Sequence, residues 1–408
     1  MKLKSLLKDL GPGLVVAATG VGAGDLVAAS VGGAYFSYVI LWSALLGALL
    51  KYALNEGIAR WQLASGKSMI EAWKSYFPSW VSYYFLVYLI IWSFIVGAAL
   101  SGACGLAAHA IFPILSVAQW GITHAIIALV LVLYFQYKFF EQIMKVMIAL
   151  MFIFVIITTI ISQPDWSLVL KGTFLPTIPP GSIWLILGII GGVGGSVTLL
   201  SYGYWIKERK WDDVSFLPKV KIDLAVAYVL TGLFGIAIMI TAAQLQPEVV
   251  NGNGMVLSLA EKIGENSGLM GKWIFLLGFW GAVFSSMLGV WQGVPFLFAD
   301  FMRTHQNSNT NSSASPIDLN KQQSYKYSLV FIALTPLVLL FFQKPVWIII
   351  AYAVTGSMFM PFLAFTLFWL NNKKNIVLKN SIFINILLFI AFALFSLLMG
   401  MKLWEYLS

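Results

Sequence analysis

The chain has 408 residues, of which 60% are hydrophobic and only 10% are charged, and its mean hydropathy is +0.87. Soluble domains carry about 25% charged residues, so this composition excludes a soluble protein and indicates a membrane protein with many spans. The single cysteine, Cys104, excludes an internal disulfide and a cysteine-rich metal site, and we expect it to be a small core residue. The basic N-terminus is followed by an apolar run without a convincing cleavage site, so no removable leader peptide is expected.

Eleven apolar segments are long enough to cross a bilayer, which requires about 20 residues. They lie at 12–34, 38–60, 80–108, 118–136, 140–162, 182–205, 220–245, 272–300, 326–343, 346–370 and 381–402. We expect a flexible cytoplasmic loop at 303–325, and a short outer helix within 246–271.

The positive charges predict the orientation of these spans. With the N-terminus in the cytoplasm, 19 of the 25 Lys and Arg residues lie on the cytoplasmic side and five on the outer side, and Lys51 lies within a span. The positive-inside rule therefore predicts a multi-pass protein of the plasma membrane with a cytoplasmic N-terminus. The same distribution accounts for the net charge of +9 without a nucleic-acid partner.

Two glycine-rich breaks interrupt the first and the sixth span. The first contains Gly20, Gly22 and Gly24, and the second contains Gly192, Gly194 and Gly195. Each glycine weakens a helix by about 1 kcal/mol relative to Ala, so both spans are predicted to unwind in mid-membrane. Such backbone is tolerated in a membrane only where it is buried or lines a cavity, and paired breaks point to a transport site.

The second broken span begins five spans after the first. Because five is an odd number, the two broken spans cross the membrane in opposite directions. We therefore predict an all-α membrane protein with a 5+5 inverted repeat. Its first repeat is residues 1–163, its second is residues 164–371, and residues 372–408 add an eleventh helix.

Polar residues beside the breaks are the predicted substrate-binding groups. Asp25 follows the first break, and an ionisable group at the bilayer centre costs about 2.5–3.5 kcal/mol, which favours a functional role over pure helix capping. Ser196 and Thr198 accompany the second break, although hydroxyls in membrane helices usually bond to their own preceding turn. Lys51 is predicted to pair with Asp25, to act as a cation near the site, or to pair with neighbours on its own helix.

Some polar groups are predicted to be structural. Glu56 and Arg60 have the spacing of a helical ion pair. His109 and His124 lie near segment ends, where we expect them at the membrane interface, and no Asp or Glu occurs between Glu71 and Glu141 to form a proton relay. The chain contains no phosphate-binding loop, metal cluster or catalytic triad, so it is not predicted to be an enzyme and no cofactor is expected.

The order of several short motifs resembles the Nramp family of divalent-metal transporters. The matching residues are Gly11-Pro12, Gly33-Ala34-Tyr35-Phe36, Leu41-Trp42, Ala59-Arg60, Ser65-Gly66-Lys67 and Pro361. The resemblance covers nearly the whole chain in span order and is most specific in spans 1 and 2. It implies the LeuT-type fold, with helices 1 and 6 broken and a cytoplasmic N-terminus.

The metal-binding signatures of that family are absent. Its first break reads Asp-Pro-Gly-Asn, where this chain has Gly22, Ala23, Gly24 and Asp25. Its sixth span reads Met-Pro-His-Asn, where this chain has Gly195, Ser196, Val197 and Thr198. The resemblance therefore indicates a divergent branch that has lost the soft thioether ligand and the histidine.

A hard, partly hydrated cation such as Mg²⁺ or Mn²⁺ fits the remaining donors, because carboxylates, carbonyls and water suit such ions. The predicted metal ligands are Asp25, Gly22 and Gly192. The alternative is a small organic or inorganic anion, or an amino acid, held on the glycine-rich half-helix ends with Lys51 nearby. In either case the expected partners are the lipid bilayer and a small ion or molecule, and we expect a monomer.

Overall fold

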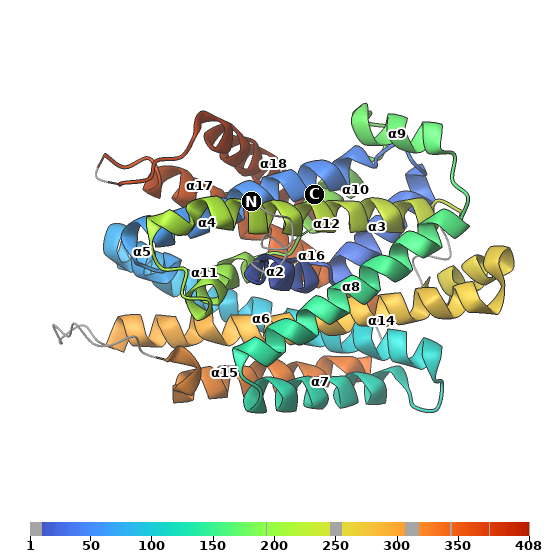
Figure 1. The fold of residues 1–408 in the computed structure, drawn as a ribbon, viewed down its shortest axis with the longest axis horizontal. Helices are drawn as coiled ribbons and strands as arrows, with labels where there is room; N and C mark the ends of the chain where they lie inside the picture. The colour runs from blue at the N-terminus through green and yellow to red at the C-terminus, as the bar shows by residue number, and fades with distance from the viewer. Residues whose placement is uncertain are drawn as a thin grey trace.

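The computed structural model describes residues 10–192, 194–244, 255–306, 318–342, 345–374 and 376–407, while the side chains of a few helical residues, Asp25 among them, lie outside this description. All regular elements in these ranges are helices (Figure 1). They are α2 (Pro12–Gly20), α3 (Ala23–Phe36), α4 (Trp42–Ser65), α5 (Met69–Tyr76), α6 (Ser79–Ile111), α7 (Val117–Tyr134), α8 (Tyr137–Ile161), α9 (Trp166–Phe174), α10 (Ile183–Gly192), η1 (Val197–Leu200), α11 (Ser201–Glu208), η2 (Val214–Phe216), α12 (Leu217–Ala242), α14 (Met255–Gln306), η3 (Leu319–Lys321), α15 (Gln323–Leu334), η4 (Thr335–Phe342), α16 (Pro345–Met358), α17 (Met360–Leu370) and α18 (Ile382–Leu407).

Each of the eleven predicted spans coincides with one helix or with a short series of consecutive helices. Eight of these, in the described ranges, are long and apolar enough to cross a membrane, and one of the eight, Ile183–Glu208, contains the second break. The other three are the α2–α3 pair, α4 with its buried charges, and the α16–α17 pair. The prediction of a multi-pass helical architecture is confirmed.

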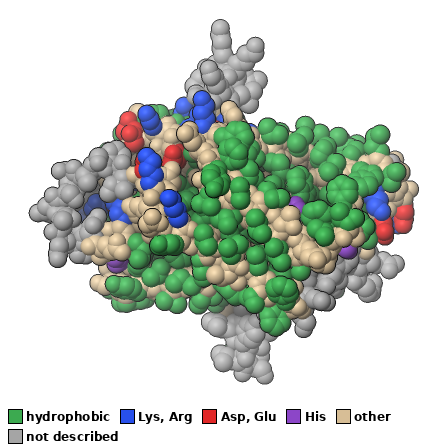
Figure 2. Space-filling view, turned by 90° about the horizontal axis from the view of Figure 1, so that it is seen from below, with side chains coloured by type: hydrophobic (Ala, Val, Ile, Leu, Met, Phe, Trp, Pro, Cys, Tyr) green, Lys and Arg blue, Asp and Glu red, His purple; other side chains and the backbone are tan. Residues whose placement is uncertain are grey.

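The surface has the distribution of a protein surrounded by lipid. Figure 2 shows a face whose middle is covered by hydrophobic side chains, with Lys, Arg, Asp and Glu gathered towards the two ends. The exposed apolar side chains of the protein include Val146 and Ile153 of α8 and Val229 of α12. On a soluble protein such an apolar area would be a liability, whereas here the acyl chains of the membrane cover it.

The two broken spans lie next to each other in the centre of the bundle. Helix α2 packs against α8, α12 and α14, and Figure 1 shows it in the middle of the molecule. Helix α10 packs against α3, α4 and α16, and both η1 and α11 contact α2. The breaks of the two spans are therefore brought together in the protein interior.

Local sequence signals determine several helix ends on the periphery. Ser68 and Glu71 form a capping box that starts α5, and Gly66 adopts a left-handed conformation (φ 70°) that ends α4. The predicted outer helix is confirmed from Met255 onwards and meets span 8 at Gly268, whose φ of 69° interrupts α14, whereas 245–254 lie outside the described residues. The predicted loop at 303–325 also falls largely outside them, at 307–317.

Candidate functional site

The first break separates α2 from α3 by two residues. Val21 has non-helical backbone angles (φ −85°, ψ 73°), and its N–H donates to the carbonyl of Ala17 at 3.0 Å. The carbonyls of Ala18 and Thr19, at the end of α2, lack partners within their own helix because the helix stops. The first break is thus present where the glycines predict it.

Two serines of α14 satisfy the carbonyls at this break. Ser285 Oγ donates to the carbonyl of Ala18 at 3.1 Å, and Ser286 Oγ donates to the carbonyl of Thr19 at 2.7 Å. Both serines are buried. The C-terminal end of α2 is therefore capped by neutral hydroxyl groups, which leave each carbonyl oxygen a second lone pair.

The second break is longer and more strongly unwound. Helix α10 ends at Gly192, and the chain resumes as the 3₁₀ helix η1 before α11 begins at Ser201. Gly194 and Gly195 have φ values of 88° and 85°, a conformation that other residues adopt only under strain. The glycines at these two positions are thus required by the backbone itself.

The two breaks touch each other through backbone atoms. A Cβ atom placed on Gly20 would lie 2.8 Å from the carbonyl carbon of Gly194 and 3.0 Å from its oxygen. On the other side, the Cα of Gly20 lies 3.4 Å from the position that a Cβ on Gly195 would occupy. Segments that are more than 170 residues apart in the sequence are therefore in van der Waals contact, and only glycine permits this approach.

Lys51 of α4 reaches the second break. Its side chain is fully buried, and its ammonium donates to the carbonyl of Gly191 at 3.0 Å and to the carbonyl of Gly195. The ammonium thus lies at the C-terminal end of α10, where the helix dipole favours a positive charge. Of the three predicted roles for Lys51, this geometry matches a cation beside the site.

The alternatives on its own helix are excluded by other pairings. Asn55 donates to the hydroxyl of Tyr228 at 3.0 Å. Glu56 forms an ion pair with Arg60, which confirms the predicted helical pair. A contact between Lys51 and the Asp25 carboxylate stays a prediction, because that side chain lies outside the described residues.

The hydroxyls near the second break differ in their contacts. Ser196 Oγ is buried and has no hydrogen-bond partner within the described residues, and it lies 2.8 Å from the position of a Cβ on Gly356 of α16. The indole N–H of Trp92 is also buried without an acceptor and lies 3.5 Å from the same point. Thr198 is buried one turn later, with Oγ1 2.7 Å from a Cβ position on Gly195.

Gly22 and Gly24 are two of the predicted substrate-binding positions, and both belong to the first turn of α3. The carbonyl of Gly22 accepts the N–H of Leu26 at 3.1 Å and so belongs to the first turn of α3. Gly24 is buried in the same turn. Their participation in substrate binding, like that of Gly192, stays a prediction.

One carboxylate that is not among the predicted site residues lies beyond the breaks, where α2 and α11 begin. Asp223 of α12 is buried, and it accepts the N–H groups of Gly11 (3.1 Å) and Gly13 (2.6 Å) and the hydroxyl of Tyr202 (3.0 Å). An acidic residue inside the apolar run 220–245 is the signal that would have found it. Ser285 and Ser286 were also missed, because nothing in sequence distinguishes a serine that bonds to another helix from one that bonds to its own.

His124 faces the protein interior, and its expected depth at the membrane interface stays a prediction. His124 is buried, and its Nε2 accepts the indole N–H of Trp280 at 2.9 Å. This pairing satisfies the imidazole within the protein, so it does not need the membrane surface. His109 is half-buried and its Nδ1 lies 2.7 Å from the carbonyl of Leu115. Cys104 is fully buried, as predicted.

Comparison with known proteins assigns the family. Residues 13–405 match the family model described as natural resistance-associated macrophage protein-like, or Nramp. The chain belongs to the Nramp family. The resemblance inferred from the motifs of spans 1 and 2 is thereby confirmed, and so is the prediction that the protein belongs with membrane transporters and not with enzymes.

Curated relatives of this Nramp chain are distant. The divalent metal cation transporter MntH of Brucella suis biovar 1 (strain 1330) is 26% identical over 260 residues, which span 59% of this chain and 55% of that relative's length. MntH of Caldanaerobacter subterraneus subsp. tengcongensis is 25% identical over 299 residues, or 70% of each protein.

Solved structures show the fold. A mutant of the manganese transporter of Eremococcus coleocola superposes with a TM-score of 0.78 at 17% identity, covering 97% of this chain and 86% of that one. MhsT in complex with L-phenylalanine superposes with a TM-score of 0.58 at 18% identity, covering 95% and 97% of the two chains. The LeuT-type fold predicted for this Nramp protein is confirmed.

Proposed function

We propose that this Nramp protein is a secondary-active transporter that moves a divalent metal ion across the membrane by alternating access. The family supports this function, and the two bacterial relatives carry the name divalent metal cation transporter. The observation on which the proposal depends is the contact between the two breaks at Gly20 and Gly194. Transporters of this architecture bind substrate where two discontinuous helices meet near the bilayer midplane.

The first break supplies the donors that we assign to the ion. The carbonyl oxygens of Ala18 and Thr19 are held by neutral serine hydroxyls and retain accepting capacity. Asp25 is the third residue of α3 and adds one carboxylate. Oxygen donors of this kind suit Mg²⁺, Mn²⁺ and Ca²⁺ better than softer metals.

The small number of ligands favours a partly hydrated ion. Across the described ranges, no group of three or more His, Cys, Asp and Glu side chains is arranged to hold a metal. Two carbonyls of the second break, those of Gly191 and Gly195, are already engaged by Lys51. Mg²⁺ commonly keeps several waters and uses one or two protein carboxylates, so we place it first, followed by Mn²⁺.

A second candidate substrate is a small anion or an amino acid, and one observation favours it. The positive charge of Lys51 lies at the same break as the buried hydroxyl of Ser196, which has no hydrogen-bond partner among the described residues. The start of α11 presents the positive end of a helix dipole nearby, which attracts carboxylate or phosphate groups. In this alternative Lys51 is the counter-charge of the substrate.

Asp25 distinguishes the two functions. In vesicles reconstituted with purified protein, Asp25→Asn should reduce Mg²⁺ and Mn²⁺ uptake to background, because it removes the carboxylate that we assign to the ion. The matched control is Asp212→Asn, a change at an exposed aspartate between α11 and α12, which should leave uptake unchanged.

Undiminished metal uptake by Asp25→Asn would overturn the metal site. Binding of an amino acid or a small anion that divalent metals do not affect would support the alternative instead.

The multi-pass architecture places this family member in a membrane, and we propose the plasma membrane with the N-terminus in the cytoplasm. The excess of Lys and Arg on one predicted side supports this orientation. Because Cys104 is fully buried, the chain has a low background for thiol labelling. An impermeant maleimide added to intact cells should label Lys171→Cys and leave Lys374→Cys unlabelled, and the reverse pattern would invert the topology.

A further inference from the structure

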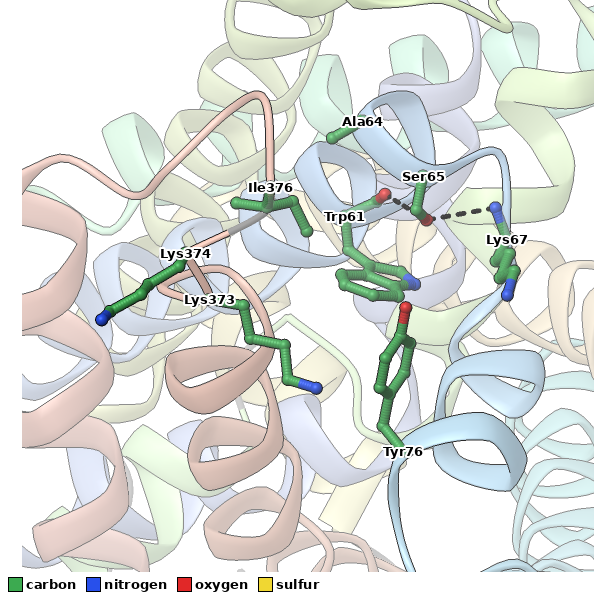
Figure 3. Close-up of a pocket in the computed structure, with 8 residues that line it drawn as sticks. All are labelled: Trp61, Ala64, Ser65, Lys67, Tyr76, Lys373, Lys374 and Ile376. Carbon is green, nitrogen blue, oxygen red and sulfur yellow. Dashed lines mark hydrogen bonds between the residues drawn. The ribbon is translucent and has the colours of Figure 1, made fainter.

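A pocket lies where α4 ends, and its lining residues on that helix, Trp61 to Ser65, lie about 15 to 21 Å along it from Lys51 at a rise of 1.5 Å per residue. It has a volume of about 560 Å³ and is formed by the end of α4, by α5 and by the segment after α17 (Figure 3). Its lining residues are Trp61, Ala64, Ser65, Lys67, Tyr76, Lys373, Lys374 and Ile376. None of them belongs to the two breaks, so this pocket is separate from the proposed transport site.

The pocket is strongly basic. Three lysines line it, and its described lining contains no Asp or Glu. Figure 3 shows Lys67 on one side of Trp61 and Tyr76, and Lys373 and Lys374 on the other. Within the part of the chain that the structure describes, none of these three lysines forms an ion pair. An anion in the pocket would therefore meet positive charge from two sides.

Aromatic rings hold one of these lysines in place without neutralising its charge. Lys373 Nζ lies 3.7 Å from the ring centroid of Tyr76 and 3.9 Å from that of Trp369. Lys67 Nζ lies 5.8 Å from the Tyr76 ring. Cation–π contacts orient an ammonium and leave its N–H donors available to an anion. Partial desolvation lowers the pKa of Lys373.

Trp61 contributes an aromatic ring to the pocket wall. The residue is almost completely buried, and its indole nitrogen is itself buried and has no acceptor among the described residues, so it does not face the pocket. Its ring packs edge-on against Tyr76, with centroids 5.7 Å apart. The two rings together hold the shape of the wall between Lys67 and Lys373.

The wall that carries Lys373 and Lys374 is fixed to α4 by hydrogen bonds. Asn371 Nδ2 donates to the carbonyl of Gly57 at 2.9 Å, and Arg60 donates to the carbonyl of Lys379 at 2.9 Å. The N–H of Asn380 donates to the carbonyl of Asn371 at 3.3 Å and closes the loop between them. The pocket is therefore a formed site between α4 and the loop before α18.

We propose that this pocket binds the phosphate group of an anionic ligand, either the headgroup of an anionic phospholipid or a soluble phosphate. Basic pockets between membrane helices at the cytoplasmic side bind phospholipid headgroups, and this pocket lies at the end of the bundle that the positive charges predict to be cytoplasmic. The lysines bind the phosphate oxygens as point charges from the two sides of the pocket.

Two probes distinguish the sources of the phosphate. The full-length protein in neutral detergent is titrated with phosphatidylglycerol, with phosphatidylcholine as the zwitterionic comparison, and lipid binding is counted by native mass spectrometry. In parallel, inorganic phosphate is added at constant ionic strength and thermal unfolding is followed. We expect phosphatidylglycerol or inorganic phosphate to bind, and the double variant Lys373→Gln/Lys374→Gln to weaken that binding by about tenfold or more.

The control variant is Lys138→Gln/Lys221→Gln, which removes two exposed lysines from the same predicted side and changes the net charge equally. Lys67→Gln is a second test that removes one charge from the opposite wall, and it should weaken binding by a smaller factor. If the pocket variant loses only phosphatidylglycerol binding, the natural ligand is a lipid headgroup. If it loses only the effect of inorganic phosphate, the natural ligand is a soluble phosphate. If both probes bind the pocket variant as tightly as they bind the control variant, the proposal is overturned.

Discussion

The two breaks expose the same kind of backbone and stabilise it in different ways. At the first break, the carbonyls of Ala18 and Thr19 accept hydrogen bonds from serine hydroxyls of α14. At the second, the carbonyls of Gly191 and Gly195 accept hydrogen bonds from the ammonium of Lys51 in α4. The C-terminal end of α2 is therefore capped by neutral hydroxyl groups, and the C-terminal end of α10 is capped by a charged ammonium.

This difference determines which break has carbonyl oxygens available to a cation. At the second break a metal ion would compete with Lys51 for the same oxygens, whereas the serine hydroxyls of the first break leave a lone pair on each carbonyl. Because the two breaks are in contact, the charge of Lys51 acts on a cation at either of them. In each case the capping helix belongs to the opposite predicted repeat, since α14 caps the break of α2 and α4 caps the break of α10. Each repeat of the inverted architecture thus contains one broken span. Side chains from the other repeat determine which groups bond to the exposed carbonyls at each break.

The largest expected effect comes from removing the charged cap. Lys51→Met leaves the carbonyls of Gly191 and Gly195 without their donor in a dry interior, which should cost roughly 2 kcal/mol or more of stability and lower the melting temperature of the purified protein. Na⁺ should then occupy the vacated oxygens and raise the melting temperature of this variant but not that of the wild type. Lys51→Arg retains a cation and is the control. A Met variant as stable as the wild type would mean that Lys51 does not fasten the second break.

A smaller effect is expected where the two breaks touch. Gly20→Ala places a methyl group 2.8 Å from the carbonyl carbon of Gly194, so the breaks must separate at a cost of about 1–3 kcal/mol, and metal uptake should fall sharply. Gly188→Ala in α10 is the matched control, because a Cβ there meets no atom within 4 Å. Equal uptake by the two variants in reconstituted vesicles would show that the close contact has no role in transport.

The smallest effect is expected at the neutral cap. Ser286→Ala removes the hydrogen bond to the carbonyl of Thr19 and should lower stability by about 1 kcal/mol, measured by thermal unfolding. Ser93→Ala removes a buried hydroxyl that has no partner in the described residues, and it should be neutral or slightly stabilising. If Ser286→Ala destabilised the protein as much as Lys51→Met, the contrast between the breaks would be lost.

The sequence was sufficient to predict the spans, the breaks and the family, because lipid demands long apolar runs and because clustered glycines weaken a helix wherever they occur. It was not sufficient to predict the carbonyl partners of Lys51, which depend on the packing of α4 against α10, while the pairing with Asp25 stays a prediction. The roles of Ser285 and Ser286 depend on a contact between segments 267 residues apart in the chain. The partner of His124 could not be predicted for the same reason, because Trp280 lies on another helix.

Asp223 has a mechanical consequence for this family member. Its carboxylate holds the start of α2 through Gly11 and Gly13 and also holds Tyr202 at the start of α11. These are the half-helices on the predicted inner side of the two broken spans. A single side chain of α12 thus links them: movement of α2 away from it breaks two hydrogen bonds, and movement of α11 breaks one. The inner ends of the two broken spans are therefore coupled through Asp223.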